Sequence, residues 1–120
     1  MVKLKAGEKE YGLRFDMYAM EKIEEKFGSM GEMTEKLQQE RSGDVIALFV
    51  ILANAELAFE RKEETVTPDA VRRMKALALK GISRAVIAAI KEGMKSETTG
   101  GAEADDEVYD VYLAEIEAKN

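Results

Sequence analysis

Alternating apolar and polar residues at the beginning of the chain predict a β-hairpin. In residues 2–5, VKLK, apolar residues alternate with lysine, and in residues 11–15, YGLRF, they alternate with glycine and arginine. A period of two on both sides of a glycine-containing turn, here at Gly7, is typical of paired strands. Because an isolated hairpin is marginal in water, its apolar face is expected to pack on a larger body.

Apolar residues at helical spacing then predict two short helices. The first begins after Asp16, a residue type that caps helices, and ends at Gly28. The second begins after Ser29, which with Glu32 has the pattern of a capping box, and ends before Ser42. Four methionines cluster in these two helices: Met17, Met20, Met30 and Met33. Core packing is the ordinary role of such residues, and an adaptable protein-binding surface is the alternative.

Two further helices complete the predicted domain. The third, at about residues 45–59, is apolar nearly all round, which is typical of the buried centre of a small domain. The fourth begins at Thr67-Pro68-Asp69 and runs to about Met94, with Gly81 marking either a close contact or a bend. The predicted fold is therefore mainly α, a helix-dominated α+β domain of four to five helices with an N-terminal β-hairpin, over residues 1–95.

The pattern changes after this domain. Residues 96–104 contain glycine, serine, threonine and acids without periodicity, which predicts a flexible linker. Residues 105–120 form an acidic segment whose apolar residues would share one face of a short helix: Val108, Tyr109, Tyr112, Leu113 and Ile116. Because so short a helix is marginal alone, it is expected to pack on its own domain as a fifth helix, or on a partner or a second copy.

The composition excludes several kinds of chemistry. The chain has no cysteine and no histidine, so disulfides, thiolate metal sites and a Ser-His-Asp triad are excluded. Glutamates near residue 24 alternate with lysines, which is typical of a solvated helix face. We therefore expect no catalytic residue, no cofactor and no metal site. A carboxylate-based enzyme would need a pocket with paired acids of shifted pKa.

The net charge of −6 is unevenly distributed. Residues 105–120 contain six acids and one lysine, which leaves only −1 for the rest of the chain. This argues against nucleic acid as a partner, because phosphate binding needs clustered lysine and arginine. The longest apolar stretch, residues 45–58, includes Asn54 and Glu56 and is shorter than the ~20 residues that span a bilayer. We expect no membrane contact and a cytoplasmic protein.

Three stretches, taken in order, resemble the tail assembly chaperones of long-tailed (siphovirus-type) bacteriophages and prophages. They are YGLRFDMYAMEKIEEKFGSMGEM at residues 11–33, DVIALFVILANAEL at 44–57 with the helix start VTPDAV at 66–71, and VYDVYLAEIEAKN at 108–120. The resemblance implies a non-enzymatic protein of the infected bacterial cytoplasm, absent from the mature virion. It would bind and solubilise the tape-measure protein and help to recruit tail-tube protein.

The family also implies a longer form made by ribosomal frameshifting. Ala118-Lys119-Asn120 can be encoded by a slippery heptamer, although ordinary codons encode it equally well. The surfaces expected to bind partners are the methionine-rich helices and the apolar face of the C-terminal segment, and self-association stays open. The alternative is a small helical adaptor or regulator unrelated to phage tails.

Overall fold

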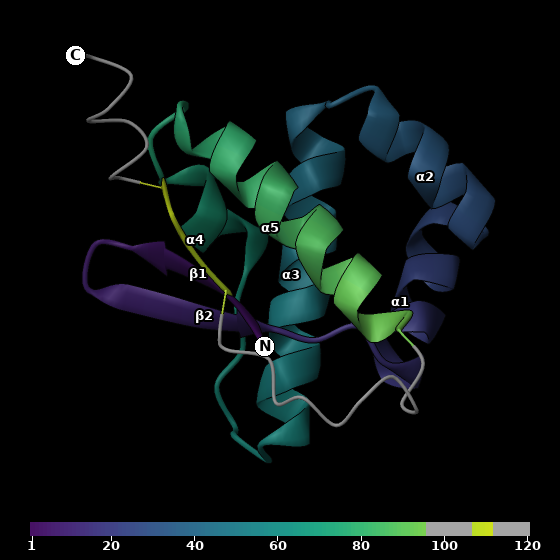
Figure 1. Cartoon of the computed structure of the whole chain (residues 1–120), viewed down its shortest axis with the longest axis horizontal. Coiled ribbons are helices and arrows are strands. Elements are labelled where there is room, and N and C mark those ends of the chain that lie inside the picture. The colour runs from purple at the N-terminus through teal and green to yellow at the C-terminus, as the bar shows by residue number, and fades with distance from the viewer. Residues whose placement is uncertain (96–106, 112–120) are drawn as a thin grey trace.

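The computed structural model describes residues 1–95 and 107–111, which form five helices and a three-stranded sheet (Figure 1). The helices are α1 (Met17–Phe27), α2 (Met30–Gln38), α3 (Ser42–Phe59), α4 (Pro68–Arg72) and α5 (Ala78–Gly93). The strands are β1 (Val2–Ala6), β2 (Lys9–Leu13) and β3 (Glu107–Asp110). The prediction of a helix-dominated α+β fold is confirmed.

The predicted hairpin is formed by β1 and β2. The two strands pair antiparallel, with Val2 opposite Leu13, and Gly7 takes a positive φ of 65° in the turn between them. Val2, Leu4 and Leu13 are buried. The sheet therefore packs its apolar face on the helices: β1 contacts α5, and β2 contacts α3.

The first two helices begin where their cap residues predict. The Asp16 carboxylate accepts a hydrogen bond from the Ala19 amide at 3.0 Å, and the Ser29 hydroxyl accepts one from the Glu32 amide at 3.1 Å. Such caps satisfy amides that the first turn of a helix leaves unpaired. Gly28 ends α1 with a φ of 101°, a conformation that costs glycine little.

Helix α3 is the centre of the molecule. It contacts all four other helices and β2, and it begins at Ser42, three residues earlier than the sequence pattern predicted. Phe49, Leu48 and Leu52 are fully buried along it. Among the described residues, α3 alone has the length and composition of a membrane-crossing helix, a test that the core helix of a soluble protein also passes.

The prediction of one helix from Pro68 to Met94 is wrong. The chain forms α4 and α5, separated by a turn in which Ala78 N–H donates to Lys75 C=O and Leu79 N–H donates to Ala76 C=O. These are bonds to the third preceding residue, which tighten the chain more than an α-helix does. The turn allows the separate helices to bury Val71 and Ala78 in the core, so packing overrides local helix propensity.

The prediction of a helix at Val108 and Tyr109 is also wrong. These residues belong to β3, which lies parallel to β1 and completes the sheet order β2-β1-β3. The Glu107 amide donates to the Met1 carbonyl at 3.0 Å, and Val111 beyond the strand is buried. The edge of β1 provides hydrogen-bond partners that an isolated amphipathic helix would not use. The predicted linker, residues 96–104, lies outside the described residues.

Candidate protein-binding surfaces

The four methionines predicted to bind partners differ in exposure. The Met17 side chain is 74% exposed, and Met20 and Met30 are half-buried at the surface of the core. Met33 is only 2% exposed, so its assignment to a binding surface is corrected: it is a core residue. Its side chain lies on the inward face of α2, where it contributes to packing rather than to a surface.

The C-terminal candidates lie in another part of the molecule. Val108 is 49% exposed on β3, whereas Tyr109 is half-buried and its hydroxyl donates to the Glu107 carboxylate at 2.9 Å. Burial raises the pKa of Tyr109, and this hydrogen bond raises it further. Tyr112, Leu113 and Ile116 lie outside the described residues.

The methionine helices and the C-terminal strand do not form one continuous site. Helices α1 and α2 contact each other and α3, while β3 contacts β1 and α5. Figure 1 shows α1 and α2 on the right of the molecule and β3 on the left. Any partner that contacts both groups must therefore extend across the molecule.

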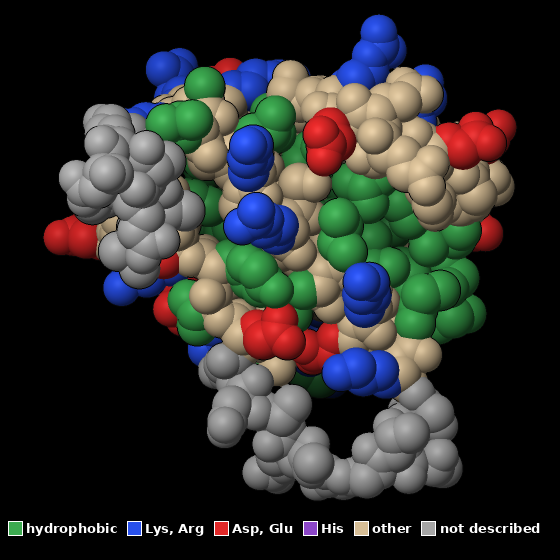
Figure 2. Space-filling model, turned by 45° about the horizontal axis from the view of Figure 1, so that its top comes forward, with side chains coloured by type: hydrophobic (Ala, Val, Ile, Leu, Met, Phe, Trp, Pro, Cys, Tyr) green, Lys and Arg blue, Asp and Glu red, His purple; other side chains and the backbone are tan. Residues whose placement is uncertain are grey.

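Half-buried apolar side chains of α1, α2, α3 and α5 pack against the edge of the core. We call the following set the apolar helix surface: Met20, Phe27, Met30, Leu37, Ile46, Val50, Leu79 and Ile90. Figure 2 shows hydrophobic side chains gathered on the right half of the displayed face, the side on which α1 and α2 lie in Figure 1. A cavity of about 310 Å³ between α3, α4 and α5 is lined by Ile46, Met74 and Leu79, so part of the helix surface is hollowed.

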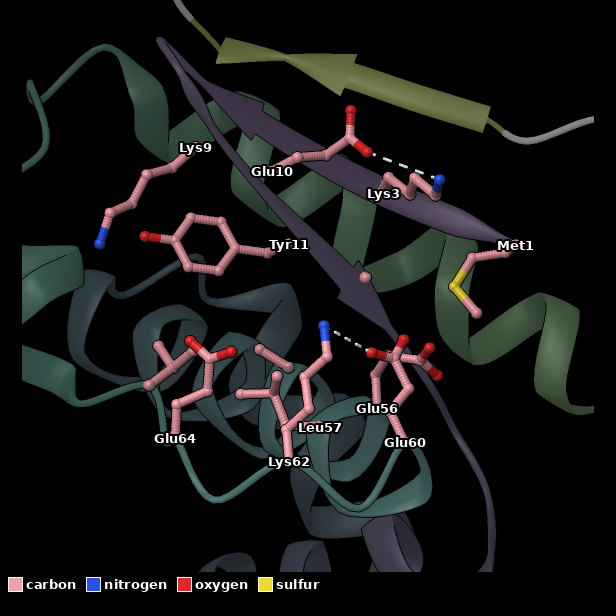
Figure 3. A pocket seen from close by; sticks show the side chains of 13 residues that line it. Met1, Lys3, Lys9, Glu10, Tyr11, Glu56, Leu57, Glu60, Lys62 and Glu64 are labelled. Atoms are coloured by element: carbon pink, nitrogen blue, oxygen red, sulfur yellow. Dashed lines mark ion pairs between the residues drawn. The ribbon is translucent and has the colours of Figure 1, made fainter.

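Another cleft lies elsewhere and is highly charged. It has a volume of about 590 Å³ and separates the hairpin from the end of α3 (Figure 3). Lys3 pairs with Glu10 on the sheet side at 3.5 Å, and Lys62 pairs with Glu60 on the helix side at 3.0 Å. Such exposed pairs contribute little stability, because solvent and salt screen them.

Glu56 is the one buried charged residue in this part of the fold. Its carboxylate accepts a hydrogen bond from Arg14 Nε at 2.8 Å, and the Arg14 guanidinium lies 3.5 Å from the centre of the Phe59 ring. Burial raises the pKa of Glu56, and a hydrogen bond with the Glu60 carboxyl raises it further. The same bond lowers the pKa of Glu60, as does the hydrogen bond from Lys62.

Glu56 and Glu60 thus form the kind of acid pair that a carboxylate-based enzyme requires. The structure also accounts for this pair without catalysis, because structural ion-pair networks shift pKa values in the same way. Arg14 joins the end of the hairpin to α3 through Glu56, and Gly12 permits this approach, since an added Cβ there would lie 2.9 Å from Glu56 Cγ. The chemistry present therefore fits an ion pair that joins the hairpin to α3.

Metal-binding geometry is not found in the described part of the chain, where no group of three or more acids could hold a metal ion.

The exposed face of α5 was not anticipated from the sequence, which drew attention to its buried apolar face. Its lysines and arginine recur at helical spacing, a signal that a search for charged as well as apolar periodicity finds.

No protein-family model matches the chain, and comparison with curated proteins and with solved structures finds no match either. The class of protein is therefore defined by the fold and its surfaces: a small helix-dominated α+β protein with an apolar helix surface.

Proposed function

We propose that this protein is a tail assembly chaperone of a long-tailed phage or prophage, which binds and solubilises the tape-measure protein and promotes tail-tube assembly. The observation that carries the proposal is the apolar helix surface, with Met20 and Met30 half-buried within it. The sequence resemblance supplies the identity of the partner. Contact with tail-tube protein, through a longer frameshifted form, and action in the bacterial cytoplasm belong to the same proposal.

The physical basis of the proposal is helix recognition. A tape-measure protein is a long helix with exposed apolar stripes, and an amphipathic helix binds by placing such a stripe on an apolar groove. Methionine side chains are flexible and polarisable, so they adapt to successive, non-identical segments of a long partner. Many copies of a 120-residue protein could then cover one tape measure.

A small helical adaptor unrelated to phage tails is the second candidate. The same apolar helix surface favours it, because binding of an amphipathic helix does not by itself identify the helix. The two functions are separated by the partner, not by the geometry of this chain.

Co-expression with the tape-measure protein of the same genome tests the proposal. We expect the tape-measure protein to become soluble and to co-elute with this chain in size-exclusion chromatography. Met30→Glu places a charge in the apolar helix surface and should abolish the complex, whereas Gln38→Glu adds the same charge on an exposed part of α2 and should not. Failure of the unaltered chain to solubilise the tape-measure protein would falsify the chaperone function and leave the adaptor.

A further inference from the structure

The solvent-facing side of α5 carries a line of exposed apolar and basic side chains. Successive members are three and four residues apart, and we call them the α5 seam: Leu77, Lys80, Arg84, Ile87, Lys91 and Met94. Leu77 is 53% exposed, Ile87 37% and Met94 66%, so three of the seven large apolar side chains exposed in the described structure lie on this one line.

The seam is positively charged and contains no acid. Lys80, Arg84 and Lys91 form no ion pair with another residue in the described ranges. Residues 67–95 contain seven lysines and arginines and only two acids, although the whole chain has a net charge of −6. Both acids are already engaged: Asp69 lies near the arginines of α4, and Glu92 pairs with the N-terminal amine at 3.4 Å.

A hollow adjoins the seam. A cleft of about 420 Å³ between α5 and β3 is lined by Arg84, Ile87 and Lys91 from the seam. Its other charged or aromatic lining residues are Glu92, Lys95, Glu107 and Tyr109. The three cations of this cleft thus face two acids, of which Glu92 pairs with the N-terminal amine and Glu107 accepts a hydrogen bond from the Tyr109 hydroxyl. Figure 2 shows Lys and Arg side chains interspersed with hydrophobic ones on this face of the molecule. The seam therefore offers apolar contacts, cations that have no ion pair among residues 1–95 and 107–111, and space for the side chains of a partner.

The spacing indicates what kind of partner fits. Side chains that alternate at three and four residues repeat every 3.5 residues on average, which is the repeat by which two helices pack along each other. The seam from Leu77 to Met94 spans 17 residue steps, or roughly 25 Å at ~1.5 Å per residue. Within this repeat Ile87 and Met94 lie seven residues apart, one heptad, so they can contact apolar residues of a second helix at the same spacing, and the cations between the apolar residues match acids on that helix.

We propose that the α5 seam is the docking surface for a partner helix that carries apolar residues at heptad spacing and acidic residues opposite Lys80, Arg84 and Lys91. This inference rests on the proposed function, and it names the chemistry of the helical partner. The apolar helix surface would provide the area of contact, and the seam would select acidic segments of the partner over basic ones.

A protein helix fits the seam better than a nucleic acid does. Leu77, Ile87 and Met94 separate the cations, and apolar side chains gain nothing against phosphates. The negative net charge of the whole chain repels a polyanion at long range. A single helix with acids at matched spacing presents its charge only where the cations lie.

Two synthetic helical peptides of equal length test the proposal, both with leucine at heptad positions, one with flanking glutamates and one with flanking lysines. Fluorescence anisotropy with the full chain should show binding of the acidic peptide only. Its affinity should fall about tenfold or more between low and high salt, because exposed ion pairs are screened. The triple variant Lys80→Glu, Arg84→Glu, Lys91→Glu should lose the acidic peptide and gain the basic one.

A matched triple variant controls for net charge. Lys9→Glu, Lys26→Glu and Lys36→Glu make the same charge change at exposed positions on β2, α1 and α2, and should leave acidic-peptide binding unchanged. The proposal is overturned if the acidic peptide does not bind, if both triple variants weaken it equally, or if duplex DNA or anionic vesicles bind more tightly than the peptide.

Failure of this inference is distinguishable from failure of the proposed function. If the tape-measure complex forms equally well with the charge-reversed α5 seam, the seam is excluded as a docking surface and the chaperone function is retained. If the acidic peptide binds selectively but no tape-measure complex forms, the chaperone function is excluded and the seam is retained as a helix-docking surface.

Discussion

Single residues determine how the hairpin is joined to the helices. Arg14 follows β2, and its side chain reaches Glu56 on α3. The backbone N–H of Arg14 donates to the Leu52 carbonyl at 3.1 Å. A buried ion pair of this kind adds little net stability compared with apolar packing, but removing one partner leaves the other charge buried and unpaired. The raised pKa of Glu56 shows that burial outweighs the attraction of Arg14.

Stability should depend on pH through Glu56. Because its pKa is raised above the ordinary 4.5, the folded protein holds the proton more tightly than the unfolded chain does. The resulting stability is complete below the unfolded pKa and is lost as the pH rises through the folded pKa. Urea denaturation of the parent and of Glu56→Gln should therefore show the parent's relative stability falling from pH 4 to pH 7.

Glu35→Gln, an exposed change of the same type on α2, controls for the loss of one charge. If the free energy of unfolding of the parent, relative to that of Glu56→Gln, rises with pH instead of falling, the assigned direction of the Glu56 pKa shift is contradicted. Loss of an enzymatic activity in Glu56→Gln, at unchanged stability, would instead favour the acid pair as a catalytic group.

At the scale of elements, β3 and α5 are joined by the packing of Val111 on Gly81. An added Cβ at Gly81 would lie 2.7 Å from Val111 Cγ1, far inside van der Waals contact. The sequence left open whether this glycine marks a contact or a bend, and the structure assigns it to the contact. A side chain from beyond β3 thereby closes the core beside α5.

Gly81→Ala should destabilise the protein by about 1–3 kcal/mol through overpacking, despite a gain of up to ~1 kcal/mol in helix propensity. Adding Val111→Ala should relieve the clash, so the double variant should lose less stability than the sum of the single variants. Gly43→Ala in α3 has no neighbour within 4 Å of the added atom and should be neutral or stabilising. Additive losses in the double variant would show that the two residues are not in contact.

At the scale of the whole molecule, one core includes residues from the hairpin, from every helix and from the C-terminal strand region. Val2, Phe49, Val86 and Val111 belong to the same buried cluster. Small domains with a single core unfold cooperatively, so a change in the C-terminal strand is expected to affect the whole fold. This differs from a C-terminal segment that packs only on a partner.

A chain ending at residue 104 should be less stable than the full chain by about 2–5 kcal/mol. It loses the hydrogen bonds between β1 and β3 and leaves a cavity where Val111 was buried. A chain ending at residue 111 keeps both and serves as the matched control. Equal urea midpoints for the chain ending at 104 and the full chain would show that the strand does not contribute to the core.

Local patterns predicted the elements whose causes are local. The hairpin follows from alternation around Gly7, and the beginnings of α1 and α2 follow from Asp16 and Ser29, whose side chains bond amides three residues later. The uniform apolarity of α3 predicted its central position. Met20 and Met30 belong to the apolar stripes of α1 and α2 and are only half-buried, because residues at the edge of such a stripe are partly exposed while those at its centre face the core.

The sequence by itself thus determined the hairpin, the first three helices and the fold class, since neighbouring residues carry those preferences. Only the tertiary structure decided that residues 68–94 form two helices, that Met33 is buried, and that residues 107–110 form a strand. Each depends on partners distant in the chain: the core beneath α4 and α5, the helices around α2, and the edge of β1. A one-dimensional pattern shows that a face is apolar, but which element covers that face depends on packing in three dimensions.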